Sequence, residues 1–414
     1  MYGSSVDRRK IAATLAYAGL AGHAFFVPVS IAGMQIALGI AAAGLLLAPL
    51  RPLRTALDWP VLALVGIAIA SDLLSPYGAP ALAEATLWRS VIGFFVVAHG
   101  IRLLPRGAPL RLLYWACAGL ALASLVGIVQ YRAGVDVVHL LGLREAPAFV
   151  QAPGAPDRFG AMGFFTSRLS YGHNATVLVA LLAGVLAAGA VPPRRIWIVA
   201  AATALGLAGV AVTFDRAAYL ALCAAALIIG LLAAPRVRRA FLPAMAALVV
   251  LSALHGGVRA RFLSAFSFET NSDRAFIWSR ALEMIRDHPL RGVGFANYSR
   301  AGAPYYDRVD PGFPMRTWAH NTELSTLAET GPLGLAALLW VFAAAARALL
   351  AHVRAREPIA LGALAALAAL LVVGQAHDVL YDTKVMYALW LALGLSLSPG
   401  APAESPKLRL AEAA

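Results

Sequence analysis

The stretch "RTWAHNTELSTLAETGPLGL", residues 316–335, combines side chains that can transfer protons with a break in the helical pattern. His320 can accept a proton near neutral pH and so act as a general base for a hydroxyl group. Gly331 can end one helix and Pro332 can begin the next. We therefore expect residues 320–330 to form a separate short helix before a long apolar run.

The spacing within this expected helix separates its two carboxylates. At about 100° per residue, Glu323 shares the face of His320, whereas Glu329 points nearly the opposite way. We expect Glu323 to orient His320, Asn321 to contact substrate and Glu329 to take no direct part. The alternative is that His320 is an ordinary interfacial residue that hydrogen bonds to lipid headgroups or to its own loop.

Arginines near the apolar runs are the next candidates. In "VTFDRAAYLAL", Arg216 follows Asp215 at a turn between two apolar segments, where an arginine is costly unless it has a partner. It either serves a site or pairs with Asp215 at the surface. In "DRAFIWSRALEMIRDHP", Arg274 and Arg280 are six positions apart and so lie on different faces of a predicted helix. One is expected to reach a site and the other to remain a solvated charge. Arg280 is kept as a candidate for substrate binding beside Arg274.

These residue types suit a reaction on a phosphorylated lipid. The planar guanidinium group of arginine binds phosphate oxygens in pairs and keeps its charge at physiological pH. A substrate with a lipid tail, a pyrophosphate and a sugar carries its own leaving group and needs no other energy source. No metal-ligand spacing and no glycine-rich phosphate loop is found in the sequence, so no metal or cofactor is expected.

The composition indicates the fold class that must position these residues. Of the 414 residues, 60% are hydrophobic and 13% are charged, which is typical of a polytopic membrane protein. With roughly 20 apolar residues per span, the chain predicts an all-α fold of about twelve transmembrane helices. The expected spans are two within 11–47, then 59–75, 86–101, 112–131, 171–190, 196–213, 217–233, 240–256, 332–350, 359–376 and 385–398.

The longer loops divide the chain into parts. Residues 1–256 are expected to hold the first nine spans, with a long outer loop near 132–170. A large outer loop and the short interfacial helix follow over 257–331, the last three spans over 332–398, and a cytoplasmic tail over 399–414. Loops of this length in a compact protein are usually functional.

Basic residues cluster in alternate short loops such as "DRRK", "RPLR" and "PRVRR". Cytoplasmic loops carry an excess of lysine and arginine, so these loops and both termini are predicted to be cytoplasmic. On this map the net charge of +13 lies on the cytoplasmic side. The basic composition therefore requires no nucleic acid as a partner.

Three segments together resemble the O-antigen ligase and polymerase superfamily of integral membrane glycosyltransferases. They are "FDRAAYLAL", "DRAFIWSRALEMIRDHPLRGVGFANY" and "HNTELSTLAETGPLGL", and their order and the long loop between the last two also fit. Asp215 departs from the pattern, in which a small residue such as serine is expected before the arginine. This departure raises the question of whether Asp215 partly neutralises Arg216.

The resemblance implies a GT-C-like enzyme of the bacterial inner membrane with a periplasmic active site. It implies an O-antigen ligase in lipopolysaccharide biosynthesis, which transfers polysaccharide from undecaprenyl pyrophosphate to a hydroxyl of the lipid A core. By this resemblance Arg216 and Arg274 would hold the pyrophosphate, and His320 would activate the hydroxyl. Asp378, in the loop "GQAHDVLYDTK", is a further candidate, with an ordinary interfacial carboxylate as the alternative.

Other functions remain open at this point. A polymerase of the same superfamily would use the same donor but extend a second lipid-linked glycan, and a protein O-oligosaccharyltransferase would modify serine or threonine. A secondary transporter would also be polytopic, but transporters usually place ionisable residues near the bilayer midplane. Here the candidate residues gather at one predicted face instead.

Overall fold

The computed structural model describes residues 2–48, 54–78, 86–145, 150–152, 155–239, 243, 254, 256–264, 272–307 and 317–398. Most of these residues are helical. The bundle consists of α1 (Tyr2–Phe26), α2 (Ile31–Leu47), α3 (Asp58–Leu73), α5 (Thr86–Gly100), α6 (Ala108–Ala133), α8 (Arg168–Ala187), α9 (Ile196–Ala211), α10 (Arg216–Leu232), α15 (Thr322–Arg354), α16 (Ala360–Gly374) and α17 (Thr383–Ser396).

Helices occupy every predicted span except 240–256, which falls almost entirely outside the described residues. By length and composition, four of the described helices can cross a membrane: Ala108–Ala133, Arg168–Ala187, Pro193–Ala211 and Thr322–Arg354. The helices α2, α10, α16 and α17 are apolar but shorter. The mostly helical structure with four candidate spans is consistent with the predicted all-α membrane protein, whereas twelve spans, their orientation and a GT-C-like arrangement stay predictions.

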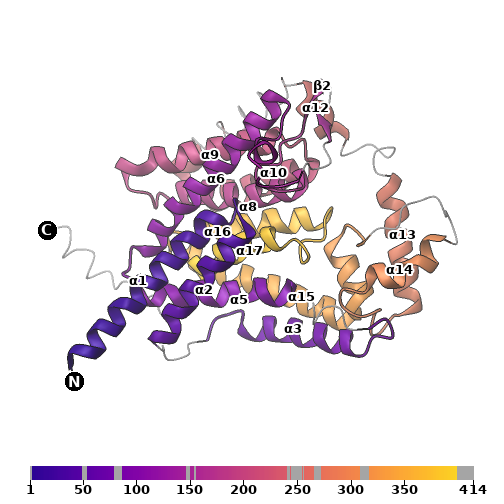
Figure 1. Ribbon diagram of the computed structural model, residues 1–414, viewed down its shortest axis with the longest axis horizontal. Helices are drawn as coiled ribbons and strands as arrows, with labels where there is room; N and C mark the ends of the chain where they lie inside the picture. The colour runs from indigo at the N-terminus through magenta and orange to yellow at the C-terminus, as the bar shows by residue number, and fades with distance from the viewer. Residues whose placement is uncertain are drawn as a thin grey trace.

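The outer-loop segments contain small elements that the sequence did not predict. The first loop holds α7 (Val137–Leu140) and a two-stranded antiparallel sheet of β1 (Gln151–Ala152) and β2 (Ala155–Phe159). The second holds α12 (Gly256–Leu263) and α14 (Tyr298–Asp307) besides the predicted helix, which is α13 (Ser272–Asp287). In Figure 1, α13 and α14 lie at the right end of the bundle, opposite the end where α1 begins.

The helix α8 runs through the centre of the bundle and is buried on nearly all sides. It crosses α16 where two glycines face each other. A Cβ atom placed on Gly184 would lie 2.4 Å from the Cα atom of Gly362, and one on Gly362 would lie 2.2 Å from the Leu181 carbonyl oxygen. Small residues let helix backbones approach closely, so this contact fixes how α8 and α16 pack.

The helix α15 breaks where the sequence predicted. Gly331 has φ 69° and ψ −171°, outside helical geometry, and Pro332 follows it. Proline has no N–H, so the Ala328 carbonyl loses its usual partner within the helix. The Val293 N–H donates to that carbonyl instead at 2.9 Å, and the Gly294 N–H donates to the Glu329 carbonyl at 2.8 Å. The segment after α13 is therefore joined to α15 at the break.

Packing around this junction forms a second small core, separate from that of the bundle. We call the described residues 272–307 and 317–330 the loop lobe. Its buried core residues are Ala281, Met284, Val293, Tyr298, Ala301, Tyr305, Tyr306, Ala319 and Ala328. The loop lobe thus has its own packing, and it joins the bundle through α15 and through hydrogen bonds to the end of α3.

Replacing Gly362 by alanine tests the α8–α16 contact. The new methyl group would meet backbone atoms that cannot move aside, and such overpacking costs roughly 1–3 kcal/mol. Gly362→Ala should therefore lower the melting temperature of the detergent-solubilised protein. Gly39→Ala is the matched control, because a Cβ atom on Gly39 of α2 meets nothing within 4 Å. Equal melting temperatures for both variants would contradict this packing.

Candidate functional site

Arg274 lies in the first turn of α13 and reaches across to two other segments. Its Nη1 atom donates to the Ala376 carbonyl at 2.6 Å and lies 3.5 Å from the His320 carbonyl oxygen. Ala376 belongs to the loop between α16 and α17, and His320 directly precedes Asn321, the N-cap of α15. One arginine therefore brings together the loop lobe and the end of the bundle.

Arg216 is the first residue of α10, at the turn after α9, and its Nη1 atom donates to the Ser264 carbonyl at 2.8 Å. It is close enough to act on Arg274. Burial and, next, the positive charge of Arg216 lower the pKa of Arg274, and the charge of Asp215 opposes this. Two like charges held near each other favour binding of an anion between them. We call Arg216 and Arg274 the cationic site.

His320 lies two residues before Thr322, the first residue of the helix on which the sequence placed it. Its φ is 52°, and Asn321 forms the N-cap of α15 by accepting a hydrogen bond from the Leu324 N–H at 2.9 Å. The prediction that His320 and Glu323 share a helix face is therefore wrong. Asparagine is a strong N-cap residue, and here the cap begins the helix after His320.

The Asn321 and Glu323 side chains both contact Gln375, at the end of α16. Gln375 Nε2 donates to Glu323 Oε1 at 3.0 Å, and Asn321 Nδ2 lies 3.4 Å from both the carbonyl oxygen and Oε1 of Gln375. Thr322 adds a hydrogen bond from its hydroxyl group to the His377 carbonyl at 2.9 Å. These contacts join the start of α15, and with it the His320 backbone, to the α16–α17 loop.

Asp378 is buried in that loop, with 2% of its surface exposed. Burial raises the pKa of Asp378 to about 7, and the nearby Ser325 hydroxyl group opposes the rise. The Ser325 Oγ atom also accepts a hydrogen bond from the Ala319 N–H at 3.1 Å. Asp378 and the residue before His320 therefore share one neighbour.

Arg280 does not join the cationic site. Its Nη1 atom donates to Glu283 Oε2 at 2.9 Å and lies 3.4 Å from the Tyr305 carbonyl oxygen, and its guanidinium group lies over the Phe276 ring. Only 8% of Arg280 is exposed, so the expectation that the second arginine is a solvated charge is wrong. Its place between α13 and α14 makes it part of the loop lobe's packing.

Glu329 is not peripheral to the site. It is buried and accepts hydrogen bonds from the Tyr381 hydroxyl group and from the Tyr298 N–H, the latter at 3.2 Å. The expectation that Glu329 takes no direct part missed this role in joining α14, α15 and the α16–α17 loop. Periodicity alone predicts a direction for the side chain and does not predict its partners.

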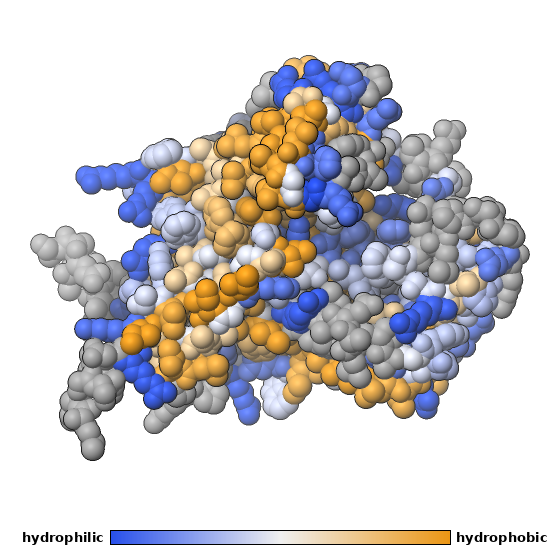
Figure 2. Space-filling model, in the orientation of Figure 1, coloured by the Kyte–Doolittle hydropathy of each residue, from blue (hydrophilic) through white to orange (hydrophobic). Residues whose placement is uncertain are grey.

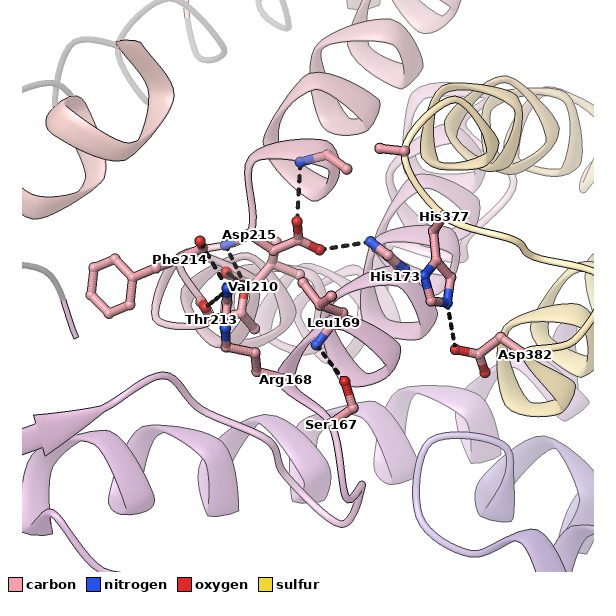
Figure 3. Close-up of polar contacts among 12 residues, drawn as sticks. Ser167, Arg168, Leu169, His173, Val210, Thr213, Phe214, Asp215, His377 and Asp382 are labelled. Carbon is pink, nitrogen blue, oxygen red and sulfur yellow. Dashed lines mark hydrogen bonds and ion pairs between the residues drawn. The ribbon is translucent and has the colours of Figure 1, made fainter. Parts of the chain in front are cut away.

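The sequence reasoning missed two histidines beside the cationic site. His173 Nε2 lies 2.7 Å from Asp215 Oδ2, and His377 Nε2 lies 3.4 Å from Asp382 Oδ2. The two imidazole rings lie 4.9 Å apart, and Figure 3 shows the four residues in a row. Among the described residues, no group of three or more His, Cys, Asp or Glu could hold a metal ion.

A signal for these histidines was present. His173 stands in "RLSYGHNATVL", within an otherwise apolar span, and ionisable residues in spans are functional candidates by default. His377 adjoins Asp378, which was the only candidate predicted from the sequence in this loop. Figure 2 shows hydrophilic side chains in the recess between the bundle and the loop lobe, so polar groups gather at this end of the molecule.

The fold and the site define a helical membrane protein with arginines and histidines clustered at one end of its bundle. Residues 201–339 match the family model described as O-Antigen ligase. This match covers α10, Arg274 and His320, and it supports the assignment of the chain to the O-antigen ligase family, as the resemblance of the three motifs predicted. Members of this family are glycosyltransferase-like enzymes. A comparison with curated proteins gives no match.

Arg274 and Arg280 form a matched pair on one helix. If the cationic site binds a lipid pyrophosphate, Arg274→Ala should weaken that binding by roughly 10- to 100-fold, because a charge-assisted hydrogen bond contributes about 1.5–3 kcal/mol. Arg280→Ala should mainly lower the melting temperature, since Arg280 packs within the loop lobe. Binding to the purified protein in detergent, with melting curves for both variants, measures the two effects. Equal losses of binding would argue against the cationic site.

Proposed function

We propose that the chain is an O-antigen ligase. It would transfer a polysaccharide from undecaprenyl pyrophosphate to a hydroxyl group of the lipid A core, at the periplasmic face of the inner membrane. The observation that carries this proposal is the approach of Arg216, Arg274 and the His320 backbone at one end of the bundle. The family match supports the superfamily, and the cationic site supports a pyrophosphate donor.

In the proposed reaction, the guanidinium groups of Arg216 and Arg274 bind the pyrophosphate oxygens of the donor. The His320 imidazole accepts the proton of the acceptor hydroxyl group, whose oxygen attacks the anomeric carbon. The bond between that carbon and the phosphate oxygen breaks, and undecaprenyl pyrophosphate leaves with the electron pair. Direct displacement inverts the anomeric centre, and the arginines stabilise the charge on the leaving group.

The residues around His320 have supporting roles in this proposal. Asn321 and Glu323 hold the start of α15 against Gln375, so they would fix the backbone that carries the base. Asp378 would act through Ser325 and not on the substrate. Because a misplaced general base loses much of its effect, these contacts are expected to matter for transfer more than for donor binding.

Lipopolysaccharide from a strain that lacks this chain separates the ligase from its nearest alternatives. For a ligase, gels should show loss of all long-chain lipopolysaccharide together with accumulated lipid-linked polymer. Single repeats on an intact core would instead indicate a polymerase. Unchanged lipopolysaccharide with loss of glycan from a protein would indicate a protein O-oligosaccharyltransferase. Either of the last two outcomes would contradict the proposal.

The role of His320 can be tested by measuring donor binding and transfer on the same preparation. His320→Ala should still bind undecaprenyl pyrophosphate-linked glycan, because the arginines hold the pyrophosphate. Transfer should fall by roughly 10²- to 10⁴-fold, the usual contribution of a general base. Loss of donor binding along with transfer would make His320 a phosphate ligand or a structural residue.

A further inference from the structure

A buried carboxylate adjoins the cationic site. Asp215 is 5% exposed, immediately precedes Arg216, and its negative charge acts on Arg274. If Arg216 and Arg274 bind pyrophosphate, a carboxylate in this place has two unfavourable effects. It repels the phosphate oxygens, and it competes with them for guanidinium N–H groups.

The two carboxylate oxygens of Asp215 contact groups on α10 and α8. Oδ1 accepts a hydrogen bond from the Ala217 N–H at 3.1 Å and so caps the start of α10. Oδ2 lies 2.7 Å from His173 Nε2, on α8 (Figure 3). His173 is buried, with 1% of its surface exposed, so this contact is shielded from water. Both carboxylate oxygens are therefore engaged on the bundle side of the site.

The position of His173 is fixed from its other side by the α16–α17 loop. The His377 ring lies 4.9 Å from the His173 ring, and the His377 Nε2 atom lies 3.4 Å from Asp382 Oδ2. Asp382 in turn caps α17, where its side chain accepts a hydrogen bond from the Val385 N–H at 3.3 Å. His173 thus lies between Asp215, the N-cap of α10, and the His377 ring, which in turn approaches the N-cap of α17.

We propose that His173 is a positioning residue for the donor site, which holds the Asp215 carboxylate so that it does not compete with pyrophosphate at Arg216 and Arg274. This proposal rests on the proposed function, in which these arginines bind the donor. It also explains how the chain accommodates an aspartate directly before a phosphate-binding arginine. The role requires only an N–H group at Nε2, since a neutral or a charged imidazole can both donate to Oδ2.

The test is binding of undecaprenyl pyrophosphate in detergent micelles to the full chain. His173→Ala removes the donor to Oδ2 and should weaken binding by roughly tenfold. The double variant His173→Ala/Asp215→Asn removes the competing charge as well, and asparagine keeps the N-cap. Its affinity should therefore exceed that of His173→Ala. His173→Gln, which retains an N–H group near the Nε2 position, should recover most of the loss.

A purely structural role for His173 predicts a different pattern. In that case the double variant would bind as weakly as His173→Ala or more weakly, because a second buried group would have been lost, and the proposal would be overturned. Unchanged binding by His173→Ala would overturn it as well. If His173→Ala does not fold, His173→Leu takes its place: it fills the same space without an N–H group, so it should bind as weakly as expected for His173→Ala, and adding Asp215→Asn should restore binding. No recovery in that double variant would contradict the proposal.

Failure of the proposed function has its own signature in this experiment. The wild-type chain would then bind undecaprenyl pyrophosphate no better than undecaprenol, which has the same tail and no phosphate. That outcome removes both proposals. Selective binding by the wild type with an unaffected His173→Ala variant removes only the role of His173.

Discussion

Backbone hydrogen bonds at the break in α15, together with contacts from the end of α3, hold the segment between α13 and α14, and the site depends on them. The Val293 and Gly294 N–H groups donate to carbonyls that the break leaves without helical partners. The Glu329 side chain strengthens the same junction, because it accepts from Tyr381 and Tyr298. A buried polar group without a partner costs free energy, so these groups favour this one docked arrangement. Since α13 carries Arg274, the junction also sets the distance between Arg274 and His320.

Two residues beside the charged groups of the site have positive φ angles, which non-glycine residues rarely adopt. His320 has φ 52°, and Phe214, two residues before Arg216, has φ 54°. Non-glycine residues in this region are uncommon and persist where the surrounding structure holds them. Here the holding contacts are known: the Arg168 Nη1 atom donates to the Phe214 carbonyl at 3.1 Å, and Asn321 caps the helix after His320. The two strained backbone positions therefore lie just before the starts of α10 and α15, one of them near the candidate side chain of Arg216 and the other at His320 itself.

The sequence predicted what depends on local pattern. Hydropathy located the helices, the Gly331–Pro332 pair located the break in α15, and periodicity with a terminal proline located α13. Features that depend on long-range contacts were missed. The His173–Asp215 pair joins α8 to α10, and no periodicity within either helix indicates it. The error at His320 arose because the N-cap preference of Asn321 prevailed over the assumption that the helix begins at His320.

In the proposed function, donor binding and proton transfer fall to different kinds of group on different elements. The cationic site uses guanidinium groups, which stay charged across the physiological range, and they lie at the starts of α10 and α13. His320 lies on a turn that α15 and the α16–α17 loop hold in place. Charges for donor binding are therefore present before the acceptor arrives, whereas the base depends on the packing of a separate segment. For the proposed ligase, which would keep a lipid-linked glycan until a second lipid arrives, this division would let the arginines hold the donor before the base acts.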